Sequence, residues 1–190
     1  MRKAPEATRP ARWSGPVRLL HWTMAGLVLT LLALGFVMTQ GTLDGAFDLA
    51  TSFTLYQWHK WIGLLVLALG LPRLAARAAT PAPAALAGWQ GRAARAAHGG
   101  LYVLMLAMPV TGWLATSASP LHLPLLVPLP VLGPVALPDL IAPDARAYAL
   151  LSTAHEILAF ALIGLVALHV AGAARHALVD RDDTLRRMAP

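Results

Sequence analysis

The stretch SGPVRLLHWTMAGLVLTLLALGFVM, residues 14–38, is long and apolar enough to cross a lipid bilayer, yet it carries His21 and Trp22 in its first turns. A hydrocarbon core of about 30 Å needs roughly 20 residues of helix. Lipid offers the backbone no other hydrogen-bond partners, so such a span is expected to be helical. The sequence holds four runs of this kind, at residues 16–38, 58–76, 96–117 and 153–174. It therefore predicts an all-α, four-helix transmembrane bundle with up-down-up-down topology.

The composition agrees with a membrane protein whose partner is lipid. Of 190 residues, 57% are hydrophobic and 13% are charged, and the mean hydropathy is +0.61. The first apolar run is too long for a cleaved signal peptide, and no small-residue cleavage site follows it. The chain has no cysteine, which excludes disulfides, iron–sulfur clusters, thiolate metal sites and covalently attached c-type haem.

The basic residues predict how the bundle is oriented. Lys60 and Arg146 fall on one side of the predicted spans, and the other thirteen of the 15 Lys and Arg fall on the opposite side. By the positive-inside rule both termini are expected in the cytoplasm. The net charge of +6 is explained by this asymmetry, so we expect no nucleic-acid partner.

We interpret residues 1–190 as a single domain with one long outer segment, residues 117–152. The linker TPAPAALAGWQGR at 80–92 is short, so the second and third spans are expected to be antiparallel neighbours. In the outer segment, SPLHLPLLVPLPVLGPVALP at 119–138 has prolines too dense for a membrane helix. We expect an irregular cap there, functional or merely a lid, followed by a short helix near PDARAYALL at 143–151.

The histidines fall at two depths when the chain is threaded through the membrane. His59 and His155 share the outer level and form the natural outer pair. His155 and His169 are 14 residues apart on the last span, which places them within roughly 40° of one another and about 21 Å apart along the helix. One face of that span thus offers one imidazole to each leaflet.

The inner level has four candidate histidines. His98 and His176 lie beside arginines at the expected headgroup boundary, so the deeper His21 and His169 are paired. Two imidazoles at one depth are what a low-spin b-type haem requires. Such an iron moves electrons and does not bind oxygen. Gly63, one turn from His59, could leave space for a porphyrin, although small residues also serve ordinary helix packing.

Other interpretations stay open at this point. The sequences HW at His21 and WHKW at His59 are also typical of interfacial anchoring, and His122 in the proline-rich segment is interpreted as structural. A histidine-based metal transporter would place its ligands at one depth with carboxylates nearby, whereas here Glu156 is the one acid close to a span histidine. A third class is a membrane anchor without a cofactor.

Five stretches taken together resemble the bacterial cytochrome b561 family: RLLHW, LYQWHKWIGLLVLALGLPRLAAR, HGGLYVLMLAMPVTGW, HEILAFALIGLVALHVAG and VDRDDTLRRM. They occur in order over nearly the whole chain. The resemblance implies a multi-pass protein of the bacterial inner membrane, with two haem b groups that exchange electrons with quinone. The family's ligands would fall on His21 and His169 for the inner haem, and on His59 and His155 for the outer haem.

The resemblance also suggests finer roles. The family includes a superoxide oxidase that passes electrons from periplasmic superoxide to ubiquinone, and His98 and His176 resemble its pattern as a quinone or proton site. Lys60 and Arg73 are expected near haem propionates, unless both only extend to the interface. The outer segments carry a net charge of −3, which would not steer an anion. The alternative is a quinol-linked electron-carrier subunit for a partner dehydrogenase or a periplasmic acceptor.

Overall fold

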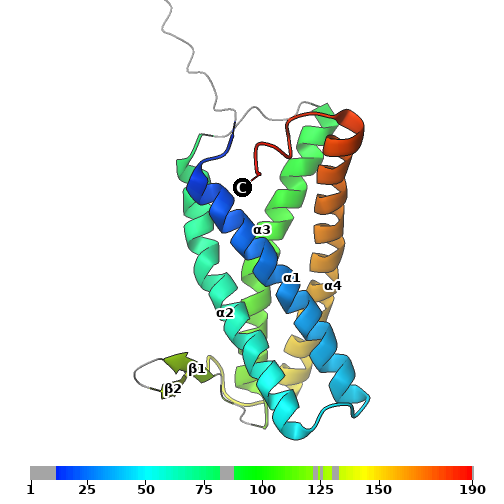
Figure 1. Ribbon diagram of the computed structural model, residues 1–190. Helices are drawn as coiled ribbons and strands as arrows, with labels where there is room; N and C mark the ends of the chain where they lie inside the picture. Colours follow the sequence, from blue (N-terminus) through cyan, green and yellow to red (C-terminus); the bar gives the residue numbers. More distant parts are fainter. Residues whose placement is uncertain (1–11, 82–87, 122–123, 125, 130–132, 190) are drawn as a thin grey trace, which may run out of the picture.

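A computed structural model describes residues 12–81, 88–121, 124, 126–129 and 133–189. Within this part of the chain the structure is a bundle of four long helices with a small two-stranded sheet at one end (Figure 1). The helices are α1 (Gly15–Leu43), α2 (Leu49–Ala79), α3 (Gly88–Ala118) and α4 (Ala145–Arg175), and the π-helical turn η1 (His176–Asp180) continues α4. Each of the four is long and apolar enough to cross a membrane. The predicted all-α four-helix class is confirmed.

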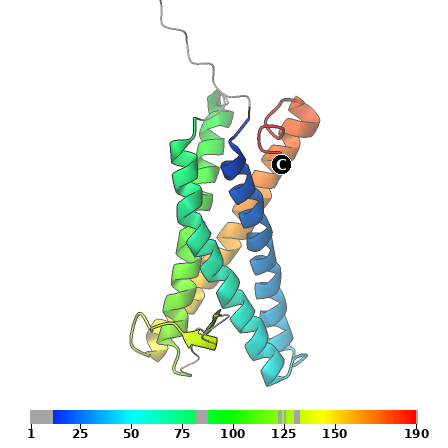
Figure 2. The same ribbon diagram turned by 60° about the vertical axis from the view of Figure 1, so that its left-hand side comes forward.

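Two names are used for the ends of the bundle, following the predicted topology. The inner end holds residues 12–22 and 175–189, and the outer end holds the α1–α2 turn and the sheet (Figures 1 and 2). A tight turn joins α1 to α2 at the outer end, where Gly45 adopts a φ of 66° that side chains disfavour.

All four helices extend beyond the predicted spans, and polar caps stabilise the first turns of α2 and α4. The Asp48 side chain accepts a hydrogen bond from the Thr51 amide at 2.8 Å, so α2 begins at Leu49 rather than at residue 58. The Asp144 side chain accepts from the Ala147 amide at 2.7 Å and caps α4. The separate short helix predicted at 143–151 is therefore wrong: most of that stretch forms the first turns of α4.

The outer segment also differs from the irregular cap that was predicted. It contains a β-hairpin formed by β1 (Leu126–Leu129) and β2 (Gly133–Ala136), antiparallel, with Leu126 opposite Ala136 and Leu129 opposite Gly133. Short apolar runs such as LVPL and GPVA, bounded by proline and glycine, suit a hairpin as well as a loop. His122, interpreted as structural, lies outside the described residues.

The apolar core lies between the two predicted histidine levels. It is formed by one or more buried residues from each helix, namely Met24, Val28, Val66, Leu104 and Leu162. Helices α3 and α4 pack closely near the inner end, where a Cβ on Gly100 would lie 2.8 Å from the Leu165 side chain. This core separates the histidines of the inner end from those of the outer end.

Candidate functional site

The outer end brings His59 of α2 and His155 of α4 together. Their ring centroids are 6.3 Å apart and the ring planes meet at 73°. Glycines of the other two helices lie against these rings: a Cβ on Gly35 would be 3.4 Å from His59 Cε1, and one on Gly112 would be 3.2 Å from His155 Cε1. All four helices therefore take part in seating this pair.

Thr111 orients His155. Its Oγ1 lies 3.1 Å from His155 Nδ1, and the same hydroxyl is within 2.9 Å of the Ala107 carbonyl oxygen and 3.0 Å of that of Met108. Because the hydroxyl proton goes to a backbone carbonyl, the hydroxyl oxygen accepts from Nδ1–H. The second ring nitrogen, Nε2, then keeps a free lone pair, which is the form of imidazole that binds a metal.

The inner end brings His21 of α1 and His169 of α4 together in a similar way. Their ring centroids are 6.2 Å apart, with 64° between the planes. A third imidazole, His98 of α3, lies with its centroid 5.2 Å from that of His169 and is exposed on the surface of the bundle. The structure thus places His98 beside the inner pair.

The spacing of the two pairs fits an iron bound between two imidazoles. A metal–imidazole bond is about 2 Å long, so two rings on opposite sides of one ion have centroids roughly 6 Å apart. The pairs His21–His169 and His59–His155 meet this condition, whereas His98 and His169 are too close. Nδ1 of His59 is buried without a hydrogen-bond partner in the described part of the chain. This donor set suits a b-type haem at each end.

Arg73 is the cation next to the inner pair. Its Nη2 donates a hydrogen bond to His21 Nδ1 at 3.0 Å, its guanidinium lies 5.6 Å from the centre of the Tyr102 ring, and its Nη1 is buried without a partner among the described residues. If His21 held an iron, its Nδ1 would either carry a proton or have no free lone pair, so the hydrogen bond from Arg73 would be lost. The guanidinium would then be available to an anion such as a propionate.

Lys60 faces a different partner. Its Nζ lies 3.5 Å from the carbonyl oxygen of Pro124, which also accepts a hydrogen bond from Gln57 Nε2 at 3.0 Å. Trp61 Nε1, one residue further along α2, donates to the Leu126 carbonyl. The Lys60 ammonium is thus directed at the proline-rich segment next to the outer end of α2.

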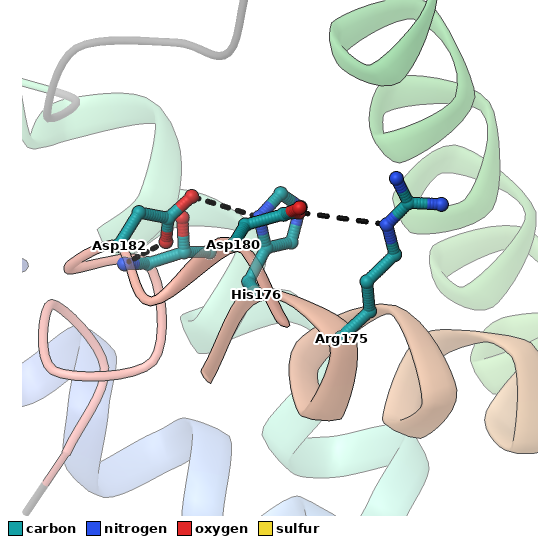
Figure 3. A network of polar contacts seen from close by, with 5 residues as sticks. Arg175, His176, Asp180 and Asp182 are labelled. Carbon is teal, nitrogen blue, oxygen red and sulfur yellow. Dashed lines mark hydrogen bonds and ion pairs between the residues drawn. The ribbon is translucent and has the colours of Figure 1, made fainter. Parts of the chain in front are cut away.

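His176 lies apart from the three inner imidazoles described above. Its Nδ1 is 2.8 Å from Asp182 Oδ2 and 3.3 Å from Asp180 Oδ2, while Arg175 Nε lies 3.5 Å from Asp180 Oδ2 (Figure 3). Hydrogen bonds from Thr184, and the nearby His176, lower the pKa of Asp182 below its ordinary value of 3.8. The two histidines predicted as a quinone or proton site therefore have different surroundings. The acids around His176 are visible in the sequence VDRDD, but the fold of the turn is needed to place them.

Residues 185–189 form a feature that sequence reasoning missed, which we call the strap. The strap returns from η1 to the first turns of α1. The Ala189 carbonyl accepts hydrogen bonds from Arg12 and Arg18, both at 2.8 Å, and the Met188 carbonyl accepts one from Trp22 Nε1 at 2.8 Å. The strap makes these contacts through its own backbone carbonyls, which no residue pattern reveals. The strap is held next to His21, whose ring lies 5.2 Å from that of Trp22.

Residues 12–190 match the family of prokaryotic cytochrome b561. The chain belongs to this family. Cytochrome b561 homolog 2 of Escherichia coli (strain K12) is 32% identical over 184 residues, an alignment that covers 94% of this chain and 92% of that protein. As a cytochrome b561, the chain is a multi-pass membrane protein that binds haem b and takes part in electron transfer.

Proposed function

We propose that this cytochrome b561 binds two b-type haems and carries electrons across the bacterial inner membrane, exchanging them with ubiquinone. One haem would be held by His21 and His169 at the inner end, the other by His59 and His155 at the outer end. The observation that carries the proposal is the pair of matched centroid distances, 6.2 and 6.3 Å, at opposite ends of one bundle. An iron with two imidazole ligands supplies one-electron exchange and has no open position for oxygen.

The inner end has the side chains that a quinone would need. His98 is exposed on the bundle beside His169, so its imidazole can exchange a hydrogen bond or a proton with a quinone carbonyl that approaches from the lipid. His176, between Asp180 and Asp182, can pass protons to and from water. Arg73 would hold a propionate once it leaves His21.

The ligand assignment is tested by counting haem in four variants. His59→Ala and His155→Ala should each lose the same haem, about half of the total in a protein with two, and His21→Ala and His169→Ala should each lose the other. Pyridine haemochrome quantification and the position of the remaining visible band measure this. His98→Ala is the matched control and should keep both haems. Loss of a haem from His98→Ala would contradict the inner assignment.

Superoxide is the outer electron donor that we propose first. Lys60, one residue from His59, is the cation of the outer end of α2, and a local positive charge would attract a small anion. We expect purified, oxidised protein to be reduced by superoxide and reoxidised by a ubiquinone analogue. Lys60→Glu should slow the reduction, and His98→Ala or His176→Ala should slow the reoxidation.

Two controls sharpen this experiment. Arg146→Glu changes the other outer cation by the same charge but lies at the start of α4, so it should slow reduction less than Lys60→Glu. Added salt should weaken the superoxide step if Lys60 steers the anion. Should superoxide leave the protein oxidised while quinol reduces it readily, superoxide is not the donor.

A quinol-linked electron carrier for a partner dehydrogenase or a periplasmic acceptor is the second candidate. It is favoured by the net charge of −3 on the outer segments and by the contact of Lys60 with the Pro124 carbonyl, because both weaken the attraction of an anion. A histidine-based metal transporter is not supported, since the histidines lie in two pairs at opposite ends and the family is one of haem proteins.

A further inference from the structure

The outer segment contains a stretch that is too apolar and too poor in charge for a loop surrounded by water. Residues 119–138 contain no Asp, Glu, Lys or Arg, although they join two helices outside the apolar core of the bundle. Leu121 is 74% exposed and Val135 is 40% exposed. An uncharged, apolar segment with exposed side chains is typical of a surface that contacts something other than water.

Tryptophan and amide side chains fix the height of this segment on the bundle. Trp61 of α2 donates to the Leu126 carbonyl, and Trp113 of α3 donates to the Pro138 carbonyl at 3.2 Å. Gln57 of α2 donates to the carbonyl of Pro124, which precedes β1. Tryptophan is enriched where a membrane meets water. The hairpin is therefore fixed on the bundle at the height of two tryptophans, a residue type typical of membrane surfaces.

The hairpin extends away from the bundle rather than over it. In Figure 1 β1 and β2 lie to the side of the outer end of α2, and turning the molecule brings the hairpin forward in Figure 2. In a membrane, the space beside a helix at this height is occupied by lipid headgroups and the upper acyl chains.

We propose that the described residues of the segment 119–138, the hairpin strands β1 and β2 among them, form a lipid-contacting element that lies in the outer membrane interface. A two-stranded sheet has open edges, so it cannot enter the hydrocarbon core, but headgroups and water can satisfy those edges. Proline lowers this demand further because it has no N–H to satisfy. Pro128 and Pro134 are partners in the hairpin register. The segment has six prolines in all, at Pro120, Pro124, Pro128, Pro130, Pro134 and Pro138.

The absence of cysteine makes the proposal directly testable. A nitroxide is attached to Val135→Cys in the haem-loaded protein in lipid nanodiscs, and its collisions with oxygen, which concentrates in lipid, are compared with those with a water-soluble nickel chelate. Ala142→Cys, exposed on the same side just before α4, is the matched control. Oxygen should relax the nitroxide at residue 135 more effectively than the nickel chelate does. At residue 142 the nickel chelate should be the more effective of the two.

Each other result overturns the proposal. If the label at residue 135 is as accessible to nickel as that at residue 142, the hairpin stands in water. If both reagents fail to reach it, protein covers the hairpin, either a second copy or a partner. Leu121→Cys, 74% exposed before the hairpin, gives a second reading should Val135→Cys lose haem. None of these outcomes depends on quinone or superoxide.

Discussion

Thr111 is the residue whose hydroxyl group is hydrogen-bonded to Nδ1 of His155 in the outer pair. Thr111→Val keeps the shape of the side chain but removes the acceptor for Nδ1–H. We expect the variant to bind the proposed outer haem roughly 10- to 100-fold more weakly, the usual cost of losing such a partner. Transfer of haem to apomyoglobin measures the change.

Thr111→Ser is the matched control for that variant, since it keeps the hydroxyl and should release haem at nearly the original rate. The inner haem should be retained in both variants, because Thr111 contacts only the outer pair among the described histidines. Equal release from the valine and serine variants would show that the hydroxyl does not orient the ring.

The histidines also show which contacts can be predicted from the depth of a residue in the membrane, counted along its helix, and which cannot. Depth correctly placed His21 near His169 and His59 near His155, because each helix rises by a fixed amount per residue. It did not place His98 beside His169, because that contact depends on the rotation of α3 about its axis. The hydrogen bond of Arg73 to His21 could not be predicted from the sequence either, since it depends on the conformation of a long side chain.

At the scale of elements, the strap depends on a turn that His176 and Asp182 stabilise. The Asp182 carboxylate accepts from the Thr184 amide at 2.8 Å, and the Asp182 amide donates to the His176 carbonyl at 3.1 Å. Because the pKa of Asp182 is lowered, the contribution of its carboxylate is present above about pH 3.8 and is lost only as the pH falls through the lower, folded value. We therefore expect the turn to persist throughout the physiological range.

Trp22 is the neutral side chain that fastens the strap to α1. Trp22→Phe removes the donor to the Met188 carbonyl and should favour opening of the strap by about 1 kcal/mol, or about fivefold. Trypsin cleavage after Arg186 and Arg187, followed by mass spectrometry, should accelerate by a similar factor. Trp89→Phe, which replaces an exposed tryptophan at the start of α3, is the control and should leave the rate unchanged. Unchanged cleavage of Trp22→Phe would mean that this bond does not hold the strap.

The elements that the sequence misjudged are those anchored through their own backbone carbonyls. The hairpin is anchored through the carbonyls of Pro124, Leu126 and Pro138, and the strap through those of Met188 and Ala189. Hydropathy and spacing describe side chains, so they predicted the four helices well and left these two segments undefined.

At the scale of the whole molecule, the charge asymmetry predicts the orientation. Reporter fusions at Gly88 and at Pro190 should report the cytoplasm, and a fusion at Leu129 should report the periplasm, because the sequence assigns thirteen of the 15 basic residues to the inner side of the predicted spans. Alkaline phosphatase and green fluorescent protein activities give complementary readings at each position. The reverse pattern would exchange the labels inner and outer throughout.

The last helix has a consequence for how the protein is made. In the proposed assignment α4 supplies His155 to one pair and His169 to the other, and its partners His21 and His59 belong to the first two helices. A ribosome delivers α4 to the membrane after all the others, so neither pair is complete while the chain is still being synthesised. An incompletely synthesised chain would therefore have only one histidine of each pair available to a haem. Binding of both proposed haems would wait until the fourth helix had inserted.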